Sequence, residues 1–349
     1  MTEKDLELIK DLCKIPGAPG FESNIRKFIC EVIAPYVQEY SIDALGNIIA
    51  LKKGKGEGKL MFTAHMDEIG FIVQHIDDEG FIKFLPLGGF DPKTLTAQRI
   101  IIHGKEDVVG VMGCKPIHIM SQEERNKVTV IKDYFIDTGL SKEELSHKIS
   151  IGDPITRERD LIKMGKCING KSLDNRISVY VLIQMLKQMQ DMNHDCDVYM
   201  VFTVQEEVGL RGAKTITQQI NPDFAINIDT TIAFDVPGAQ ANEVITKLGD
   251  GVGIKIMDNS VLSDYRMIKF LKEVAEKYSH SWQPELLPAG ATDTFAIQTG
   301  GHGCIAGALS IPTRHIHQVI EMVHTEDVEE TIGFGLSITK EINNFNWSH

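Results

Sequence analysis

The sequence predicts an α/β protein in which helices cover a largely parallel, mixed sheet and a smaller β-rich domain is inserted into the chain. After about residue 165, short apolar runs alternate with helical patterns, as in parallel strands joined by helices. Between about residues 70 and 165, short alternating segments are instead separated by glycine and proline, which is typical of β structure. The 349 residues are enough for roughly two domains. We therefore expect residues 1–69 and 166–349 to form one domain and residues 70–165 to form the inserted one.

The first 69 residues are expected to contain two helices, a hairpin and a strand. Apolar residues recur at helical spacing in residues 6–13 and 25–33, and Pro16 and Pro35 follow these two segments. Residues 36–53 have the pattern of a hairpin that turns at residues 43–47. An apolar strand at residues 59–64 then leads directly to His65.

The inserted segment contains one expected helix, which begins near Ser141, where a hydroxyl and two following glutamates suit a helix N-terminus. Beyond the insertion, residues 175–190 are apolar on nearly all sides, which predicts a buried helix. The remaining elements alternate between the two types. Strands are expected at residues 198–204, 224–228, 253–257 and 304–309, and helices at residues 212–220, 264–278 and 325–342.

Composition and charge exclude several classes of function. The net charge of -13 disfavours a nucleic-acid or anionic-membrane partner, since both require a basic surface. No apolar run approaches the roughly eighteen residues that span a bilayer, and the first residues lack the basic start and apolar core of a secretory signal. The six cysteines are scattered singly, which is typical of reduced, buried thiols. We therefore expect a cytoplasmic protein without nucleic-acid or membrane partners.

Two adjacent carboxylates, Glu206 and Glu207, end the apolar run at residues 198–204. Neighbouring side chains at a strand end point in different directions, so one carboxylate could hold a metal ion while the other faces a reacting water. Gly209 and Gly212 would let the chain turn tightly from the strand into a helix. An isolated pair of glutamates is more often the solvated start of a helix, so the interpretation depends on the rest of the chain.

Other potential metal ligands also lie at the ends of predicted elements. His65, Asp229 and the pair His315 and His317 each follow a predicted strand, and Asp174 precedes the buried helix. Because the carboxyl ends of parallel strands meet at one edge of a sheet, these side chains could converge. Taken singly, the two aspartates are more often caps of a turn or a helix. A single histidine is more often a surface or core residue, so the convergence carries the hypothesis.

The ligand types suit a pair of divalent metal ions. Two imidazoles with three carboxylates favour borderline ions such as zinc, cobalt or manganese, and ligand type does not separate the three. One carboxylate can bridge two such ions, an arrangement that activates water against an acyl or phosphoryl centre. Asp67 lies two residues beyond His65 and could accept the proton of the imidazole nitrogen that does not bind metal.

Six motifs occur in order over nearly the whole chain. They are Ala64-His-Met-Asp-Glu-Ile-Gly70, Gly88-Gly-Phe-Asp-Pro92, Leu173-Asp-Asn-Arg176, Gln205-Glu-Glu-Val-Gly-Leu-Arg-Gly-Ala213, Asp229-Thr230 and Ile311-Pro-Thr-Arg-His-Ile-His317. Together they resemble the M42 family of dinuclear metallo-aminopeptidases, which includes the tetrahedral and glutamyl aminopeptidases. The resemblance implies a fold of the dinuclear zinc-peptidase type and peptide substrates with a free amino terminus. It also implies that residues 70–165 help subunits associate, as dimers that build a hollow tetrahedral dodecamer.

The same resemblance implies the ligands of two divalent ions, with zinc or cobalt favoured and manganese possible. It makes Asp174 the carboxylate that bridges them. Glu207 and His317 would complete the ligands of one ion, and His65 and Asp229 those of the other.

The resemblance also implies the catalytic and substrate-binding residues. Glu206 would be the general base, and Asp67 would be the partner behind a histidine ligand. Thr292, Asp293 and Arg314 are expected near the substrate by their position in the family, although Thr292 equally suits the start of a helix.

Three positions depart from the pattern of the family. The family usually has Arg-Tyr-Ile-His-Ser where this chain has Arg314-His-Ile-His-Gln318, so His315 becomes a second candidate ligand. Register favours His317, which two residues along a strand would face the same side as His315. Ser178 replaces a frequent glycine and is expected to affect helix packing only. His324 replaces a frequent acidic residue and is expected at the surface.

Two other functions are compatible with the sequence. Some chains of the family are labelled endoglucanases, but a glycan hydrolase needs a carboxylic acid and a carboxylate on either side of the sugar bond. Here the central carboxylates are expected to bind metal. A non-catalytic metal-binding assembly protein is the second alternative, and the complete set of ligands and base disfavours it. The side-chain preference stays open, since a basic pocket would suit acidic termini and an apolar pocket would suit leucine.

Overall fold

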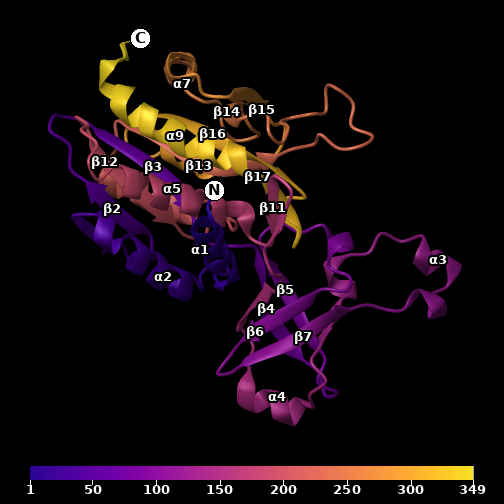
Figure 1. Cartoon of the computed structure of the whole chain (residues 1–349). Helices are drawn as coiled ribbons and strands as arrows, with labels where there is room; N and C mark the ends of the chain where they lie inside the picture. Colours follow the sequence, from indigo (N-terminus) through magenta and orange to yellow (C-terminus); the bar gives the residue numbers. More distant parts are fainter. Residues whose placement is uncertain (349) are drawn as a thin grey trace.

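The computed structural model describes residues 1–348, which form a large sheet covered by helices and a small separate barrel (Figure 1). The large sheet has 11 strands. Its main path runs through β1 (Glu39–Ile42), β2 (Ile48–Lys52), β12 (Asp197–Thr203), β3 (Lys59–His65), β13 (Phe224–Ile232), β16 (Ile305–Arg314), β17 (Glu321–His324), β11 (Cys167–Gly170) and β10 (Ile162–Met164). Two further strands branch from β16, which pairs with β14 (Val252–Met257), and β14 pairs with β15 (Trp282–Leu286).

The centre of this sheet is parallel. Strands β12, β3, β13 and β16 are neighbours that run in the same direction, whereas β1, β2, β17, β11 and β10 pair antiparallel. Leu60 and Phe62 of β3 pack in the core on one face of the sheet, and Met61 packs in the core on the other. Successive side chains of a strand point to opposite faces, so β3 must be covered on both sides. The mixed, largely parallel sheet that the sequence predicts is confirmed.

Helices cover both faces of the sheet. One face carries α1 (Glu3–Lys14), α2 (Ser23–Ile33), α5 (Leu173–Gln188), α7 (Tyr265–Tyr278) and α9 (Thr325–Glu341), and the other carries α6 (Arg211–Ile220) and α8 (Asp293–Gln298). In Figure 1, α5 and α9 lie side by side across the sheet. Helix α5 is buried almost all round, as its continuous apolar pattern predicts. Ser178 is buried within this helix, a position from which it can affect helix packing, as expected.

The barrel is closed and antiparallel. Its strands, in spatial order, are β4 (Gly70–Ile76), β5 (Ile82–Leu87), β8 (Phe135–Asp137), β7 (Asp107–Gly113), β6 (Arg99–His103) and β9 (Pro154–Arg157). Helix α4 (Lys142–Lys148) begins as expected, because the Ser141 hydroxyl accepts a hydrogen bond from the Glu144 N–H. The short helix α3 (Gln122–Arg125), which the sequence did not predict, lies on an arm at residues 114–133 that projects from the barrel (Figure 1).

Four strands of the large sheet were not expected from the sequence. All three residues of β10 are exposed, so this strand has no apolar pattern, and β11 and β17 are only four residues long. Strand β15 contains Pro284 and the buried Glu285, which are both uncommon in strands. The last barrel strand ends at Arg157, and the next strand, β10, already pairs in the large sheet. The chain therefore returns to the large sheet before residue 165, where the boundary was expected.

Within residues 1–348, no helix combines the length and apolar character needed to cross a membrane.

Candidate metal centre

The ends of the central strands bring distant residues to one edge of the sheet. In the parallel pair β3 and β12, His65 lies opposite Thr203, so the loop that carries Glu206 and Glu207 begins beside His65. Strand β13 runs parallel to β3 on its other side and carries Asp229. The expected convergence at the carboxyl ends of parallel strands is therefore present.

Asp174 also lies at this edge, in the irregular first turn of α5. Ser172 has a φ of 60° and Asp174 has a ψ of 104°, and the peptide bond between Asp174 and Asn175 is cis. One carboxylate oxygen of Asp174 lies 3.2 Å from His65 Nε2, and the other lies 3.3 Å from His317 Nε2. The side chain thus faces two imidazoles rather than capping the helix, and each of its oxygens approaches a different imidazole.

Two groups of potential ligands meet at Asp174. In the first, Asp229 Oδ1 lies 3.7 Å from His65 Nε2, and in the second, Glu207 Oε2 lies 3.5 Å from His317 Nε2. The ligand atoms of each group, with one oxygen of Asp174, all lie within 4.8 Å of one another. We call the set of His65, Asp174 and Asp229 the strand group, and the set of Asp174, Glu207 and His317 the loop group.

The Glu206–Glu207 pair is not a solvated helix start. Helix α6 begins only at Arg211, and Glu206 is 8% exposed. The two carboxylates approach different imidazoles, since Glu206 Oε2 lies 3.9 Å from His65 Nε2 whereas Glu207 is close to His317. The tight turn depends on glycine, because a methyl group at Gly212 would lie 2.6 Å from a backbone oxygen.

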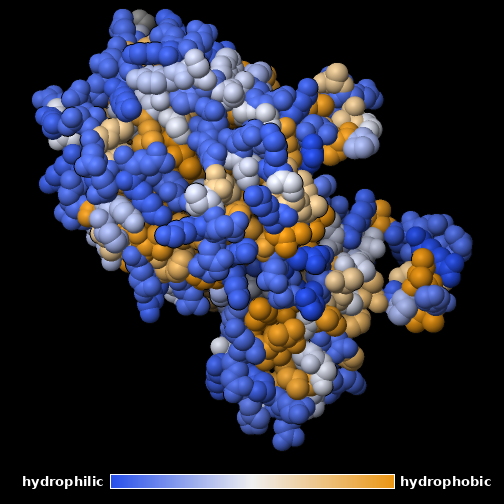
Figure 2. All heavy atoms as spheres, viewed as in Figure 1, coloured by the Kyte–Doolittle hydropathy of each residue, from blue (hydrophilic) through white to orange (hydrophobic). Residues whose placement is uncertain are grey.

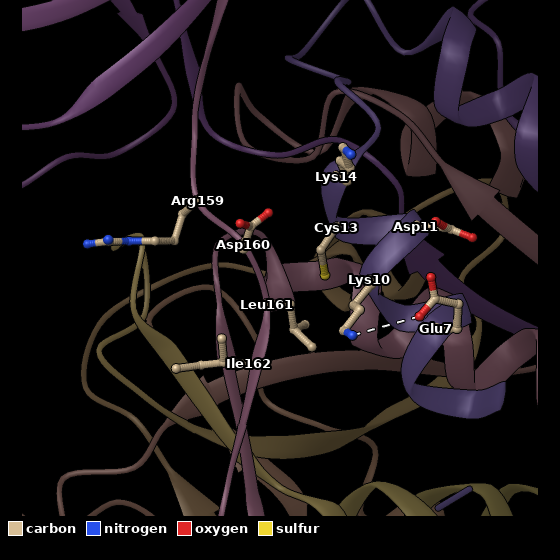
Figure 3. A pocket seen from close by; sticks show the side chains of 9 residues that line it. All are labelled: Glu7, Lys10, Asp11, Cys13, Lys14, Arg159, Asp160, Leu161 and Ile162. Carbon is tan, nitrogen blue, oxygen red and sulfur yellow. Dashed lines mark ion pairs between the residues drawn. The ribbon is translucent and has the colours of Figure 1, made fainter. Parts of the chain in front are cut away.

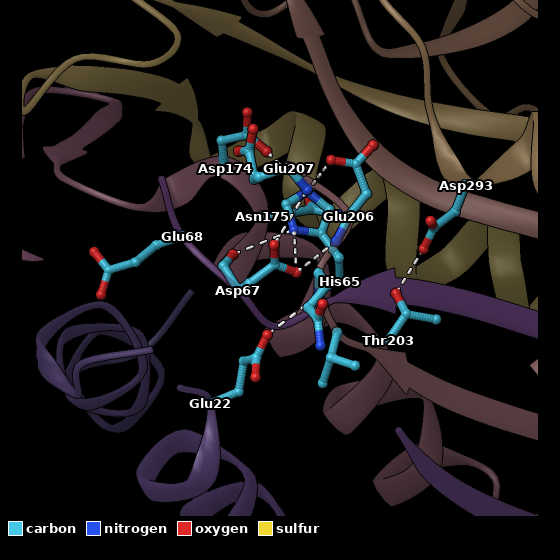
Figure 4. A network of polar contacts seen from close by, with 12 residues as sticks. Glu22, His65, Asp67, Glu68, Asp174, Asn175, Thr203, Glu206, Glu207 and Asp293 are labelled. Carbon is cyan, nitrogen blue, oxygen red and sulfur yellow. Dashed lines mark hydrogen bonds and ion pairs between the residues drawn. The ribbon is translucent and has the colours of Figure 1, made fainter. Parts of the chain in front are cut away.

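Asp67 connects this loop to His65 (Figure 4). Its two carboxylate oxygens accept hydrogen bonds from the backbone N–H groups of Glu206 and Glu207, each at 3.1 Å. Nδ1 of His65 lies 3.2 Å from the backbone oxygen of Asp67 and 3.5 Å from its carboxylate. The contact behind His65 is therefore made by both the backbone and the side chain of Asp67, and it leaves Nε2 directed at the strand group.

The two histidines after β16 do not lie on a strand. Strand β16 ends at Arg314, and His315 and His317 both have left-handed backbones, with φ values of 58° and 63°. The expectation that they face the same side of a strand is wrong, because the chain turns here. His315 is exposed, whereas His317 is directed at Asp174 and Glu207.

The three expected substrate-binding residues lie in different surroundings. Thr292 lines the cavity beside the metal ligands and precedes α8 without capping it by its side chain. Asp293 is buried and accepts a hydrogen bond from the Thr203 hydroxyl at 2.6 Å (Figure 4). Arg314 does not line this cavity, since Asp235 holds its guanidinium through two contacts of 2.6 Å. Its expected place at the substrate stays a prediction, and the sequence does not show this distant partner.

Two residues that the sequence did not suggest hold the loop group. Glu321 of β17 accepts hydrogen bonds from the backbone N–H groups of Asp174, at 2.9 Å, and His317, at 2.8 Å. Arg157, at the end of barrel strand β9, donates to the backbone oxygen of His317 at 2.9 Å. Both side chains are buried. The only signals in the sequence for these two roles were a charged residue at the start of the short β17 segment, Glu321, and a charged residue at the end of the short β9 segment, Arg157.

His324, expected at the surface, is partly exposed, and its side chain caps α9.

Burial and mutual repulsion shift the pKa values of the site. Burial raises the pKa of Glu207 to about 7 and that of Asp229 to about 6, and the neighbouring Asp174 adds to both shifts. Burial also raises the pKa of Glu206 well above its ordinary value. The pKa of His317 rises to about 10 because Glu207 and Asp174 outweigh the effect of burial. Negative charge is thus crowded into a buried space, which favours the binding of cations.

The ligands line a cavity of about 300 Å³. Another hollow of about 380 Å³ lies between α1 and the segment that follows the barrel, near Lys10 and Asp160 (Figure 3). Its charged side chains have both signs, and Glu7 pairs with Lys10 at 3.7 Å. It does not contain the converging imidazoles and carboxylates of the first cavity, which is therefore the candidate site.

A protein-family model described as M42 glutamyl aminopeptidase matches residues 46–334. The chain belongs to the M42 peptidase family. A relative from Acetivibrio thermocellus is 38% identical over 334 residues, which cover 95% of this chain and 98% of the relative. The lysyl aminopeptidase of Pyrococcus furiosus is 33% identical over 351 residues, covering 97% of each chain.

Solved structures of M42 proteins have the same fold. An aminopeptidase from Desulfurococcus kamchatkensis has a TM-score of 0.93 and 37% identity, covering 97% of this chain and 95% of its own. The TET1 peptidase of Pyrococcus horikoshii, described as assembling into a tetrahedron or a large octahedral shell, has a TM-score of 0.87 and 32% identity, with coverages of 97% and 99%. A protein named endoglucanase from Thermotoga maritima has a TM-score of 0.78 and 30% identity, with coverages of 95% and 96%.

Membership of the M42 family makes the chain a peptide hydrolase. The family implies divalent metal ions, and the strand and loop groups are two of the three candidate clusters within residues 1–348, the third being His65, Glu206 and Glu207.

Proposed function

We propose that this M42 protein is a dinuclear metal-dependent aminopeptidase that removes amino-terminal residues from peptides. The observation that carries the proposal is Asp174, which directs one oxygen at each of two imidazoles. Asp229 completes one group and Glu207 the other. With Glu206, four carboxylates and two neutral imidazoles would carry four negative charges, which two divalent cations balance. The donor set therefore fits two such ions, with zinc or cobalt favoured and manganese possible.

When bound, two divalent ions supply Lewis acidity, which lowers the pKa of water toward neutrality and polarises the scissile carbonyl. Glu206 then acts as the general base. It takes a proton from the water that attacks the carbonyl and gives that proton to the nitrogen of the leaving amine. Its burial and raised pKa suit a group that must hold a proton between these two steps. Asp67 fixes the backbone of the Glu206–Glu207 pair, so that one carboxylate serves as the base and the other as a ligand.

The cavity accounts for cleavage at an amino terminus. A free α-ammonium group is attracted to the acidic side of the cavity, where an internal peptide nitrogen would gain nothing. Thr292 lies at the wall of the same cavity and is proposed to contact the substrate.

The test is the hydrolysis of aminoacyl-p-nitroanilides before chelation, after chelation and after return of zinc, cobalt or manganese. Activity should disappear with the ions and return with at least one of them. Activity that persists after complete removal of the ions would contradict the proposal. A chain that binds two ions and cleaves none of these substrates would instead be a non-catalytic metal-binding protein.

We also propose self-association through the barrel, as dimers that build a dodecamer. Figure 2 shows hydrophobic side chains gathered on the barrel and its arm, and Leu85, Val109, Ile119 and Val128 are exposed there. Contiguous apolar surface of this kind is typical of an interaction site. The assembling TET1 relative supports this proposal. A monomer in light scattering at micromolar concentration would contradict it. A cytoplasmic location is proposed because all six cysteines are free.

A glycan hydrolase is the alternative that the endoglucanase-named relative suggests. Against it, Asp174, Glu207 and Asp229 each lie within 4 Å of an imidazole, so they suit metal binding better than attack on a sugar. Cellulose cleavage that survives chelation would revive this alternative.

A further inference from the structure

The metal ligands form only part of the lining of the 300 Å³ cavity. The last residues of β13, the end of β14 and the chain after β15 also line it, and they bring an ionic cluster that the proposed chemistry does not use. We call Lys255, Asp258 and Glu285 the far cluster. These three side chains are 1%, 3% and 0% exposed. Lys255 and Asp258 line the cavity, and Glu285 lies behind them.

The far cluster has one negative charge in excess. Lys255 Nζ contacts Glu285 Oε1 and lies 3.5 Å from Asp258 Oδ2. The Thr231 hydroxyl donates to the same Glu285 oxygen at 2.6 Å. Although burial lowers it, these carboxylates raise the pKa of Lys255 on balance, so the ammonium stays charged. One cation therefore faces two carboxylates.

Asp258 and Glu285 each have one carboxylate oxygen without a hydrogen-bond partner, and of the two only Asp258 lines the cavity. Asp258 Oδ1 accepts three hydrogen bonds, from the N–H and hydroxyl of Ser260 and the N–H of Val261. Its Oδ2 has no hydrogen-bond partner although it is buried. An ionised oxygen in this state gains most from a donor that also carries positive charge.

Part of the cavity wall is apolar. Ile232, Leu287 and Ile316 line it and are each partly exposed. A long aliphatic stem could pack against them while its polar tip reaches the far cluster, which is how lysine and arginine side chains bury.

We infer that the far cluster selects a basic amino-terminal residue, lysine or arginine, whose cationic tip binds Asp258. This inference rests on the proposed aminopeptidase function. An acidic side chain would meet Asp258 and a lysine that is already paired with two carboxylates. An apolar side chain would leave Asp258 Oδ2 with no hydrogen bond and with only the Lys255 ammonium, 3.5 Å away, as an ion-pair partner. A basic side chain supplies both the missing donor and the missing charge.

The test compares kcat/KM for lysyl, arginyl, norleucyl and glutamyl p-nitroanilides with the metal-loaded enzyme. Norleucine matches the stem of lysine without its ammonium group. The wild type should prefer lysyl over norleucyl substrate by at least about tenfold, as one charge-assisted hydrogen bond allows. The glutamyl substrate should be the poorest of the four.

Asp258→Asn is the decisive variant, because asparagine keeps an oxygen for the Ser260 and Val261 hydrogen bonds while losing the charge. The ratio of kcat/KM for lysyl and norleucyl substrates should fall by about tenfold. Asp191→Asn, on the exposed turn after α5, is the matched control and should leave the ratio unchanged. Glu285→Gln should also lower the ratio, since it removes the excess negative charge.

Preferred cleavage of glutamyl substrate by the wild type would overturn the inference. An unchanged ratio in a folded Asp258→Asn variant would do so as well. In both cases the enzyme still hydrolyses aminoacyl substrates, so the proposed function survives. Failure to hydrolyse any of the four substrates would instead count against the proposed function.

Discussion

The strand group and the loop group share Asp174, but they are held in different ways. His65 and Asp229 lie on neighbouring parallel strands in the middle of the sheet, and both are buried. Glu207 and His317 lie on irregular segments, and the His317 side chain is 35% exposed. Side chains on packed strands have few alternative positions, whereas a turn needs contacts from elsewhere to hold its shape.

The loop group obtains these contacts from outside its own segment. Glu321 binds the N–H of His317, and Arg157 binds its backbone oxygen. Arg157 belongs to the barrel, and a methyl group on Gly89 of the barrel would lie 3.4 Å from the His317 ring. The barrel therefore shapes one half of the metal centre and leaves the other half to the sheet. The strand group should bind its ion more tightly, and the loop group should depend on the barrel.

The largest expected difference is between His65→Ala and His317→Ala. Loss of His65 leaves Asp174, Asp229 and Glu206 without their shared imidazole in a buried space, so we expect both ions to be lost. Loss of a residue that only hydrogen-bonds to a metal ligand lowers activity by up to roughly 100-fold, and we expect a larger loss here because His65 is itself a ligand. His317→Ala should retain one ion and a smaller loss of activity. The measurement is the metal content of desalted protein beside kcat/KM, and equal metal loss in both variants would contradict the comparison.

A smaller effect is expected when the barrel contact is removed. Arg157→Met keeps the length and packing of the side chain but cannot donate to His317. It should weaken the second ion bound by about 10- to 100-fold, with little change for the first. Titration with cobalt, followed by the visible absorption of the bound ion, separates the two steps. Arg99→Met, on an exposed side chain of the same barrel, is the control. If both variants bound two ions as the wild type does, Arg157 would have no role in positioning.

The smallest effect expected is a difference in pH dependence. In the metal-free protein, the carboxyl of Glu207 has a pKa of about 7 and that of Asp229 a pKa of about 6. Below these values each carboxyl holds a proton that an ion must displace, and the imidazoles of His65 and His317, whose pKa values are also raised, must release theirs as well. Affinity should therefore rise with pH by up to about tenfold per unit for each proton. Between pH 6 and 8 the rise should be steeper for the loop group. Calorimetry in buffers of different ionisation enthalpy counts the released protons, and affinity that falls across this range would show the wrong sign.

The fold and the convergence of the ligands could be predicted because each signal is local in the sequence. His65, Glu206 and Asp229 follow apolar runs that the sheet must bury, and parallel strand ends meet at one edge. Partners across long sequence distances could not be predicted. Arg157 contacts His317 across 160 residues. Arg314 was expected at the substrate from its position in the family, and nothing in the sequence shows its pairing with Asp235.

Backbone shape was also beyond the sequence. The alternation of a regular strand correctly predicted the position of His65. It gave a wrong orientation for His315 and His317, because their left-handed backbones turn the chain. In the same way, β10 has only three residues and all are exposed, so no apolar pattern marks where the chain returns from the barrel to the large sheet.

The most direct test of the account compares Glu206→Gln with Glu207→Gln, measuring turnover and bound metal in the same samples. The two residues are adjacent, and Asp67 holds both backbones, yet their carboxylates face different imidazoles. Glu206→Gln should lower kcat by about 10²- to 10⁴-fold, the usual contribution of a general base, with both ions retained. Glu207→Gln should lose the ion of the loop group. Identical defects in the two variants, or near wild-type turnover in Glu206→Gln with both ions bound, would contradict the division of roles.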